Sequence, residues 1–308
     1  MRLLLYTAGS DADAWIDALR HALPAARIEP WPGPAASAAD YALVWKAPPE
    51  LLRDLRRVKA VFNLGAGVDA IVGDPALPPE VCLVRLEDAG MAEQMAEYVC
   101  HAVLRRYREF DAYAQQQRAG LWQPRRRTSK RAFGVGILGL GALGTAVATA
   151  LTPFGFLLRG WSRTRKQIAG IATFAGASEL DAFLSGACVL VCLLPLTRDT
   201  QGLLDRATLS QLPRDAYVVN VSRGALVVDQ DLLALLDSGH IGGAMLDVFR
   251  DEPLPPEHRF WHHPRVALTP HISAVTQVDE SVAQIADKIR RIEAGLPITG
   301  IVARERGY

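Results

Sequence analysis

Three polar residues in the second half of the chain each follow an apolar run, and their types suit acid–base chemistry. Arg223 lies in VNVSRGALV, Glu252 in LDVFRDEPL and His271 in LTPHIS. Ligands of open α/β sheets bind beyond the carboxyl ends of the strands, so we expect these side chains to converge on one crevice. A carboxylate bonded to an imidazolium favours the protonated ring that a proton donor needs, and an arginine can hold a carboxylate or polarise a carbonyl. These residue types fit catalysis by all three residues, and a structural or solvated role for each is the alternative at this point.

A glycine-rich stretch ahead of these residues has the pattern of a phosphate-binding turn. Gly139, Gly141 and Gly144 are spaced as G-x-G-x-x-G between an apolar run over 135–138 and an alanine-rich segment over 142–151. The first glycine permits a tight turn, the second lets a pyrophosphate approach the backbone, and the third lets helix and strand pack closely. Because the glycines join a predicted strand to a predicted helix, they indicate a dinucleotide site rather than a turn without a ligand.

The end of the next predicted strand, over 156–158, bears on the choice of cofactor. An acid roughly 20 residues beyond the glycines would bind the ribose 2′-OH of NAD. Here the chain reads Ser162, Arg163, Thr164, Arg165 and Lys166, with no acid. Cations suit the 2′-phosphate of NADP, although an ordinary solvated basic loop is the alternative. The sequence therefore predicts that NADPH is preferred over NADH.

A second glycine-rich loop lies in the first third of the chain, where NLGAGVD spans 63–69. Two glycines directly after a strand allow successive N–H groups to form an anion-binding nest. A simple turn between a strand and a helix is the alternative, and the loop alone does not decide between them.

Apolar runs alternate with helical patterns along both halves of the chain, which predicts an α/β fold with two Rossmann-like or flavodoxin-like domains. Their sheets are expected to be parallel, with an active-site cleft between the domains. One helix over 93–117 should lead from the first domain into the second, and a last helix over 273–294 should return. The substrate-binding domain is therefore expected to be discontinuous, comprising 1–98 and 272–308, with a nucleotide-binding domain over 99–271.

Composition narrows the classes of partner and site. The chain has 308 residues and a net charge of +1, which gives no reason to expect nucleic acid or an anionic membrane as partner. The basic run from Arg125 to Arg131 is interpreted as a solvated loop. The sequence contains no apolar run long enough to span a membrane, and the first apolar stretch is too short for a signal peptide. The four cysteines have no zinc-like spacing and are predicted to be reduced and buried, so we expect a cytoplasmic protein without a metal site.

Taken together, the motifs resemble those of the D-2-hydroxyacid dehydrogenase family over nearly the whole chain. The resemblance includes NLGAGVD, GLGALG at 139–144, LLPLTRDTQGLL at 193–204, and the three motifs that hold Arg223, Glu252 and His271. The final stretch GLPITGIVARERGY and the WSR at 161–163 are more similar to the glyoxylate/hydroxypyruvate reductase A subgroup.

The resemblance implies a role for each matching residue. Arg223 would bind the substrate carboxylate and keto oxygen, His271 would give a proton to that oxygen, and Glu252 would orient His271. The substrate would also contact Trp45, Lys46, Gly65, Ala66 and Gly67. The cofactor would contact Gly139, Gly141, Ala142, Leu143, Gly144, Ser162, Arg163, Lys166, Leu194, Pro195, Thr200, Val221, Ser222, Asp247 and Ser273, with Asp247 on the nicotinamide side.

The resemblance also implies an activity and an assembly. We expect an NADPH-dependent reductase of small 2-keto acids, acting on glyoxylate and hydroxypyruvate, and a homodimer with Trp122 near its interface. The rival expectation is a nucleotide-sensing protein that binds protein partners, as the C-terminal-binding-protein corepressors of the same fold do. Those relatives keep a similar Arg, Glu and His set, so this set does not separate the two expectations.

Overall fold

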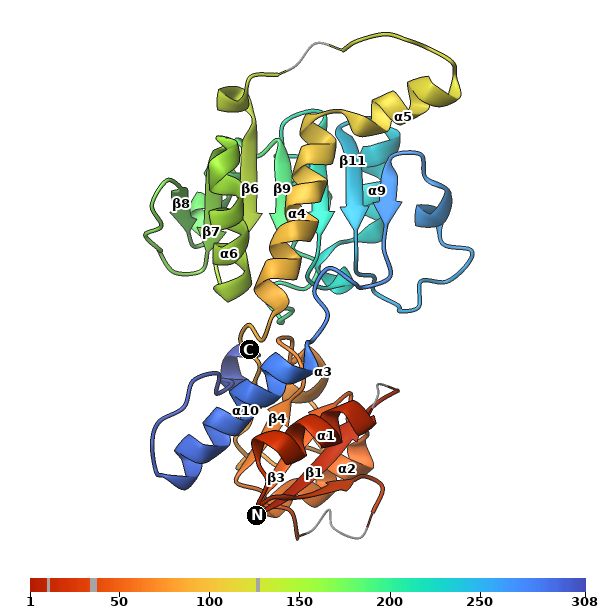
Figure 1. The fold of residues 1–308 in the computed structure, drawn as a ribbon. Coiled ribbons are helices and arrows are strands. Elements are labelled where there is room, and N and C mark those ends of the chain that lie inside the picture. Colours follow the sequence, from red (N-terminus) through yellow and green to blue (C-terminus); the bar gives the residue numbers. More distant parts are fainter. Residues whose placement is uncertain (10–11, 34–37, 126–127) are drawn as a thin grey trace. The chain divides into compact units, whose positions relative to one another are not determined.

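A computed structural model describes residues 1–9, 12–33, 38–125 and 128–308 (Figure 1). The chain divides into two units: unit 1 comprises 1–91 and 276–308, and unit 2 comprises 92–275. Each unit has its own sheet, in which all strands run parallel, and this confirms the predicted fold class.

Unit 1 is built on a five-stranded sheet with the order β2-β1-β3-β4-β5, which is the order of flavodoxin-like folds. Its strands are β1 (Arg2–Thr7), β2 (Arg27–Pro30), β3 (Tyr41–Trp45), β4 (Ala60–Asn63) and β5 (Leu83–Arg85). Its helices are α1 (Ala12–Ala22), α2 (Pro49–Asp54), α3 (Asp69–Val72) and α10 (Val278–Glu293). Every residue of β4 is buried, as expected for a strand covered on both faces.

Unit 2 is built on a seven-stranded sheet with the order β12-β11-β10-β9-β6-β7-β8. Its strands are β6 (Gly134–Leu138), β7 (Leu157–Ser162), β8 (Ala172–Ala175), β9 (Val189–Cys192), β10 (Ala216–Asn220), β11 (Ile241–Leu246) and β12 (Val266–Leu268). Its helices are α4 (Met91–Tyr107), α5 (Phe110–Arg118), α6 (Ala142–Leu151), α7 (Leu180–Leu184), α8 (Arg206–Leu209) and α9 (Asp229–Asp237). From β8 to β11 the order is 3-2-1-4-5-6, the dinucleotide-binding arrangement, and β12 extends it at one edge. The strand arrows of this sheet all point the same way in Figure 1, so one edge collects all the carboxyl ends.

The predicted single helix over 93–117 is wrong, because the structure breaks it into α4 and α5. The break lies at Glu109, whose φ of 55° is left-handed and cannot continue a right-handed helix. The apolar pattern that suggested one helix runs through the break, and no residue of α5 is buried. Phe110 and Tyr113 are therefore exposed rather than part of a core.

The cysteine prediction is confirmed for oxidation state but not for burial. All four cysteines are free thiols, yet only Cys192 is buried, and Cys82, Cys100 and Cys188 are partly exposed. Cys192 belongs to the central strand β9, and this burial raises the pKa of its thiol to about 12.

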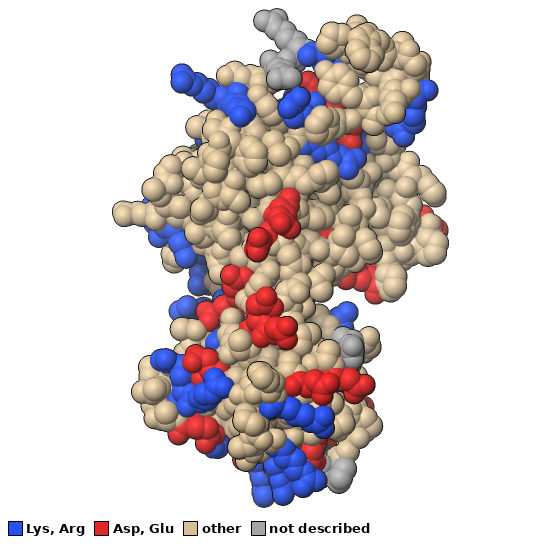
Figure 2. Space-filling model, in the orientation of Figure 1, with Lys and Arg blue, Asp and Glu red and all other residues tan. Residues whose placement is uncertain are grey.

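Charged side chains of both signs are scattered over the face drawn in Figure 2. Of the predicted basic loop, Arg126 and Arg127 lie outside the described residues, and Arg125 forms an ion pair with Glu109. Within the described ranges, no helix is both long enough and apolar enough to cross a membrane.

Candidate active site

The glycine turn of unit 2 follows β6, next to the point where the strand order reverses, and its three glycines meet different surroundings. Gly139 has a φ of 114°, and a Cβ there would lie 2.8 Å from the carbonyl oxygen of Leu193. A Cβ on Gly144 would lie 1.9 Å from the carbonyl oxygen of Gly139. Both positions are therefore closed to larger residues, as a tight turn and close helix–strand packing require.

Gly141 differs, because a Cβ there would have no heavy atom within 4 Å. Nothing in the fold itself demands glycine at this position. Gly141 is also the N-cap of α6, which begins at Ala142, and no side chain caps this end of the helix. The open space beside exposed helix N–H groups fits a pyrophosphate, so the turn is compatible with a dinucleotide.

The end of β7 carries the residues predicted to select the cofactor. Ser162 is buried and its hydroxyl donates to the carbonyl oxygen of Thr164 at 2.8 Å, which shapes the loop that follows. Arg165 donates to the carbonyl oxygen of Thr173 and forms an ion pair with Glu179. Those bonds direct Arg165 toward β8 and the turn after it. The exposed side chains of Arg163 and Lys166 belong to the same loop.

The loops after β9 and β10 are bonded to each other. The hydroxyl of Ser222 donates to the carbonyl oxygen of Leu194, so the segment with Val221 and Ser222 lies beside the start of the β9 loop. Thr200 donates to the carbonyl oxygen of Pro195 at 2.7 Å and folds that loop onto itself. The predicted cofactor residues of these two loops thus lie at the carboxyl ends of neighbouring strands.

His271 and Glu252 form a hydrogen-bonded pair, with 2.8 Å between His271 Nδ1 and Glu252 Oε2. The other oxygen of Glu252 accepts from the Phe249 N–H at 3.0 Å, so both oxygens of the carboxylate are hydrogen-bonded. His271 has a left-handed φ of 55°, and its N–H donates to the carbonyl oxygen of Asp247 at 2.8 Å. A bulky residue rarely adopts this backbone conformation, and it occurs here at a predicted catalytic position.

Arg223 belongs to the loop after β10, between the loops that carry the pair and the cofactor residues. Its Nη1 donates to the carbonyl oxygen of Ser222 at 2.8 Å. The next residue, Gly224, lies against the backbone of the Glu252 loop, because a Cβ there would be 1.9 Å from the carbonyl carbon of Phe249. The Arg223 loop and the Glu252 loop are therefore in direct contact.

Asp247 has no exposed surface, and its carboxylate organises the loop that presents His271. One oxygen accepts from the Ile272 N–H and the other from the Ser273 N–H, each at 2.8 Å. The Thr269 hydroxyl donates to the first oxygen at 2.6 Å. Asp247 thus holds both sides of His271 through main-chain and side-chain contacts.

A tyrosine of α4 completes this arrangement, and no sequence motif pointed to it. Tyr98 Oη lies 2.5 Å from Thr269 Oγ1. Because Thr269 gives its only proton to Asp247, Tyr98 must be the donor. Burial raises the pKa of Tyr98 to about 12, which keeps the phenol protonated for that bond. Three residues distant in sequence therefore form one chain of hydrogen bonds.

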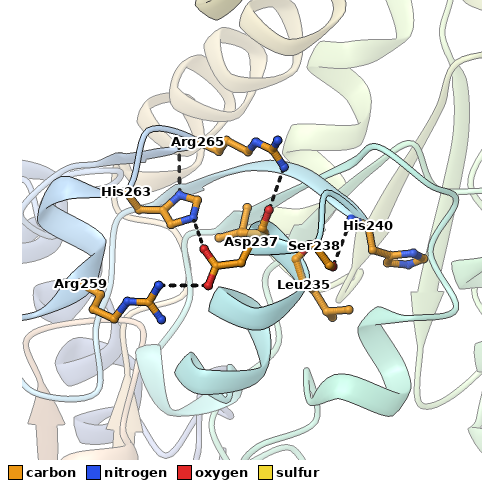
Figure 3. A network of polar contacts seen from close by, with 8 residues as sticks. Leu235, Asp237, Ser238, His240, Arg259, His263 and Arg265 are labelled. Atoms are coloured by element: carbon orange, nitrogen blue, oxygen red, sulfur yellow. Dashed lines mark hydrogen bonds and ion pairs between the residues drawn. The ribbon is translucent and has the colours of Figure 1, made fainter.

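His263, which lies outside this pair, has structural contacts, as Figure 3 shows. His263 Nε2 lies 3.3 Å from Asp237 Oδ1, and Arg259 donates to the other oxygen of Asp237 at 3.0 Å. Arg265 donates to the carbonyl oxygen of Leu236 at 2.7 Å. These contacts fasten the end of α9, and the arginine and histidine hold the pKa of the Asp237 carboxyl below its usual range.

The glycine loop of unit 1 follows β4 and has its carbonyl groups satisfied by the protein. The buried Asn63 side chain donates to the carbonyl oxygens of Gly65 and Gly67, at 3.0 and 2.9 Å. Among the described residues, no hydrogen bond is recorded for the N–H groups of Gly65, Ala66 and Gly67. Successive unpaired N–H groups are the donors that an anion-binding nest needs.

Trp45 is the last residue of β3 and its ring lies against the glycine loop. A Cβ on Gly65 would be 2.5 Å from Trp45 Cζ3, so only glycine fits under the ring. Lys46 follows with a φ of 50° and is exposed. Of the two predicted substrate residues, Trp45 therefore lies against the glycine loop.

The structure thus gathers the predicted residues into two groups, one in each unit. The carboxyl edge of the seven-stranded sheet carries Arg223, Glu252, His271, Asp247, Ser273 and the cofactor residues, and unit 1 carries Trp45, Lys46 and the glycine loop. Within the part of the chain that the structure describes, no three His, Cys, Asp or Glu side chains gather as a metal site.

Comparison with known proteins places these features in a wider group. The family model described as "D-isomer specific 2-hydroxyacid dehydrogenase, NAD binding domain" matches residues 100–273. That match contains the glycine turn, Arg223, Glu252 and His271.

Three solved structures resemble the chain over its full length. A D-isomer specific 2-hydroxyacid dehydrogenase from Xanthobacter autotrophicus Py2, in complex with NADPH and MES, is 40% identical with a TM-score of 0.95, covering 100% of this chain and 99% of that one. An NADPH-dependent glyoxylate/hydroxypyruvate reductase from Sinorhizobium meliloti, in complex with NADP and sulfate, is 36% identical with a TM-score of 0.93, covering 100% of both chains. A probable 2-hydroxyacid dehydrogenase from Rhizobium etli CFN 42, in complex with NADP, HEPES and L(+)-tartaric acid, is 33% identical with a TM-score of 0.91, covering 100% and 99%.

Proposed function

We propose a substrate and a cofactor preference for this chain, which belongs to the D-isomer specific 2-hydroxyacid dehydrogenase family. The chain is an NAD(P)-dependent oxidoreductase of 2-hydroxy acids, and its described residues include a dinucleotide-binding sheet. In the proposed reaction it reduces small 2-keto acids with NADPH, converting glyoxylate to glycolate and hydroxypyruvate to D-glycerate.

The observation that carries the proposal is the His271–Glu252 pair at the same sheet edge as the glycine turn. Because His271 Nδ1 is engaged by Glu252, Nε2 is the nitrogen that gives a proton to the keto oxygen. The negative charge of Glu252 stabilises the protonated ring and fixes its orientation. NADPH, when bound, supplies the hydride for the keto carbon.

Two groups of the protein match the carboxylate of a 2-keto acid. The N–H groups of Gly65, Ala66 and Gly67 provide neutral donors, and the guanidinium of Arg223 provides a charged donor. A 2-keto acid carries its carboxylate next to the reacting carbonyl, so a ligand of this kind has both an anion for such donors and an oxygen for a proton donor. The bulk of Trp45 beside the nest favours a short substituent at the keto carbon.

NADPH is the proposed cofactor because the β7 loop contains Arg163 and Lys166 and no acid. A cation near the adenosine ribose attracts a 2′-phosphate. Two similar proteins crystallised with NADP and one with NADPH support this preference by analogy.

The test is a panel of keto acids at saturating NADPH, followed through the loss of NADPH absorbance. We expect glyoxylate and hydroxypyruvate to be reduced more efficiently than pyruvate, and all three more efficiently than phenylpyruvate or 2-ketoisocaproate. One methylene changes selectivity only about 10–200-fold, so weaker activity on neighbours is expected. Preference for a large aromatic keto acid would overturn the size argument, and NADPH binding without any turnover would favour a protein-binding role.

The proposed assembly is a homodimer whose interface buries α5 and the Leu121–Trp122 segment that follows it. Trp122 is 100% exposed and Leu121 is 58% exposed, next to a helix that buries none of its own residues. A surface of this kind on a monomer usually marks an interaction site. Light scattering at micromolar concentration should give twice the chain mass, and Trp122→Ser should weaken the dimer; a monomeric mass for the unaltered protein would contradict the assembly.

A cytoplasmic location is also proposed. All four cysteines are free thiols, which is typical of proteins from reducing compartments. Recovery of the native protein in the soluble cytoplasmic fraction is the expected result, and secretion into an oxidising compartment would contradict it.

A further inference from the structure

The chain contains only two asparagines, Asn63 and Asn220, and they occupy equivalent places in the two sheets. Each is the last residue of a strand, β4 or β10, and each is at least 96% buried. Each also bonds to the main chain of the loop that follows it. We propose that both are positioning residues: Asn63 shapes the nest that receives the substrate carboxylate, and Asn220 fixes the backbone that carries Arg223. This inference rests on the proposed function.

Asn63 sets the direction of the nest through the geometry of the peptide group. Its amide nitrogen has two protons, and both are used, one by the carbonyl of Gly65 and one by that of Gly67. In a trans peptide the C=O and the following N–H point in opposite directions. Holding the Gly65 oxygen toward the buried side chain therefore turns the Ala66 N–H away from it. The Gly67 oxygen does the same for the N–H of Val68.

Further contacts make this loop rigid from the same side. The Leu86 N–H approaches the Gly65 oxygen at 3.3 Å, and the Thr276 hydroxyl donates to the Leu64 carbonyl at 3.2 Å. The carbonyl oxygens of Leu64, Gly65 and Gly67 thus all accept hydrogen bonds from the protein. An anion that approaches the outward side meets N–H groups rather than carbonyl oxygens, whose negative partial charge would repel it.

Asn220 uses its side chain differently, with one bond from each end of the amide. Its nitrogen donates to the carbonyl of Arg223 at 2.9 Å, and its oxygen accepts from the Ser222 N–H at 3.2 Å. The main-chain carbonyl of Asn220 accepts from the Asp247 N–H at 3.0 Å, which links this strand end to the His271 support. The side-chain amide of Asn220 therefore holds the turn that carries Arg223, and the main chain of Asn220 is itself bonded to Asp247.

Asparagine is the residue type that both positions require. An aspartate has the same shape but has no proton to give when ionised, so it would set oxygen against the carbonyl oxygens. An alanine would leave those carbonyls without their donor. Substitution by either residue should therefore change how each loop is held, while the strand ahead of it keeps its apolar packing.

The experiment measures oxalate binding to the NADPH complex by calorimetry, alongside the kinetics of glyoxylate reduction. Oxalate presents two adjacent carboxylates and accepts no hydride at the reacting position. Asn63→Ala should weaken oxalate binding and raise KM for glyoxylate about tenfold or more, with kcat changed less than about threefold and the NADPH Kd unchanged. Asn220→Ala should instead lower kcat about tenfold and also raise KM, because Arg223 acts on the carbonyl as well as on the carboxylate.

Controls separate positioning from a general loss of structure. Ser281→Ala removes another fully buried polar group of unit 1, which has no hydrogen-bond partner among the described residues, and should leave oxalate binding unchanged. Asn63→Asp and Asn220→Asp keep the side-chain volume and serve where an alanine variant does not fold. Each variant is compared only if its thermal unfolding is cooperative and its NADPH affinity matches that of the unaltered protein.

The outcomes also separate this proposal from the proposed function. Oxalate binding without keto-acid reduction in the unaltered protein would reject the reductase function, and the oxalate affinities of the Asn63 and Asn220 variants would still test both positioning roles. Unchanged oxalate affinity in folded Asn63→Ala and Asn63→Asp would overturn the role of Asn63. Unchanged kcat and KM in folded Asn220→Ala and Asn220→Asp would overturn that of Asn220, and no oxalate binding by the unaltered protein would overturn both.

Discussion

Units 1 and 2 share one architecture, a parallel sheet with loops at its carboxyl edge, but they offer a ligand different kinds of group. In unit 1 the loop after β4 presents main-chain N–H groups, and the side chain that shapes it, Asn63, is buried behind them. In unit 2 the loops after β10, β11 and β12 present side chains, namely Arg223, Glu252 and His271. Main-chain donors hold a fixed partial charge, whereas the side chains carry full charges and can exchange protons.

Under the proposed function, this difference gives the two units separate tasks. A site of main-chain amides binds an anion in the ground state and contributes to KM. A histidine paired with a carboxylate contributes to the transition state, and its loss lowers kcat. Substitutions in the two units should therefore separate in their kinetic effects, and the following predictions test that separation from the largest effect to the smallest.

The largest effect is expected at the proton donor of unit 2. His271→Ala should lower kcat about 10³-fold, within the usual range for loss of a general acid, with little change in NADPH affinity. Steady-state rates and a fluorescence titration of NADPH measure the two quantities. His262→Ala removes an exposed histidine of the same unit and should leave the rate unchanged. A loss below tenfold in His271→Ala would remove it from the proton-transfer step.

Glu252→Gln should follow, with kcat lowered about 10–100-fold, because a neutral amide replaces the anion bonded to His271. Steady-state kinetics of glyoxylate reduction provide the measurement. An unchanged kcat would exclude Glu252 as the partner that matters for proton transfer.

A pair of glycine substitutions contrasts the two loops directly. In Gly65→Ala the new Cβ would meet Trp45 at 2.5 Å and displace the nest, so KM for glyoxylate should rise about tenfold, equivalent to roughly 1.4 kcal/mol. In Gly141→Ala the new Cβ points into open space within the protein, so the fold should be unaffected and KM for NADPH should rise instead. If both variants raise the same KM, the assignment of the loops to different ligands is wrong.

The smallest expected effect concerns the cofactor. The unaltered protein should use NADPH about tenfold more efficiently than NADH, or roughly 1.4 kcal/mol, and Arg163→Asp should remove most of that preference. Arg165→Gln is the matched control, because Arg165 already bonds to Glu179 and Thr173 and should contribute less. Ratios of kcat/KM for the two cofactors test this prediction. Equal efficiency with NADH in the unaltered protein would refute it.

The parts of the site that the sequence predicted are those encoded locally. The glycine spacing at 139–144 specifies a turn within a few residues, and the structure gives Gly139 and Gly144 steric reasons while Gly141 faces open space. The His271–Glu252 pair was predicted because both residues follow strands whose carboxyl ends share one edge. In each case the spacing of a short motif, together with strand direction, was sufficient.

The parts that could not be predicted depend on distant contacts or on side-chain direction. Tyr98 and Thr269 are 171 residues apart, and no motif links them. Asn63 lay within a recognised loop, but the residue type alone does not reveal whether the amide faces the ligand or supports the loop. The break at Glu109 was hidden because apolar residues continue past it at helical spacing without any core to cover them.

The use of main-chain amides in unit 1 has a consequence for how this protein responds to mutation. Every residue except proline carries an N–H, so most substitutions at Ala66 leave the donor itself in place. Recognition of the carboxylate is encoded in the path of the chain, which Asn63 and the space beneath Trp45 maintain. The nest therefore depends on supporting residues, whereas in unit 2 a substitution at Arg223, Glu252 or His271 removes the proposed functional group itself.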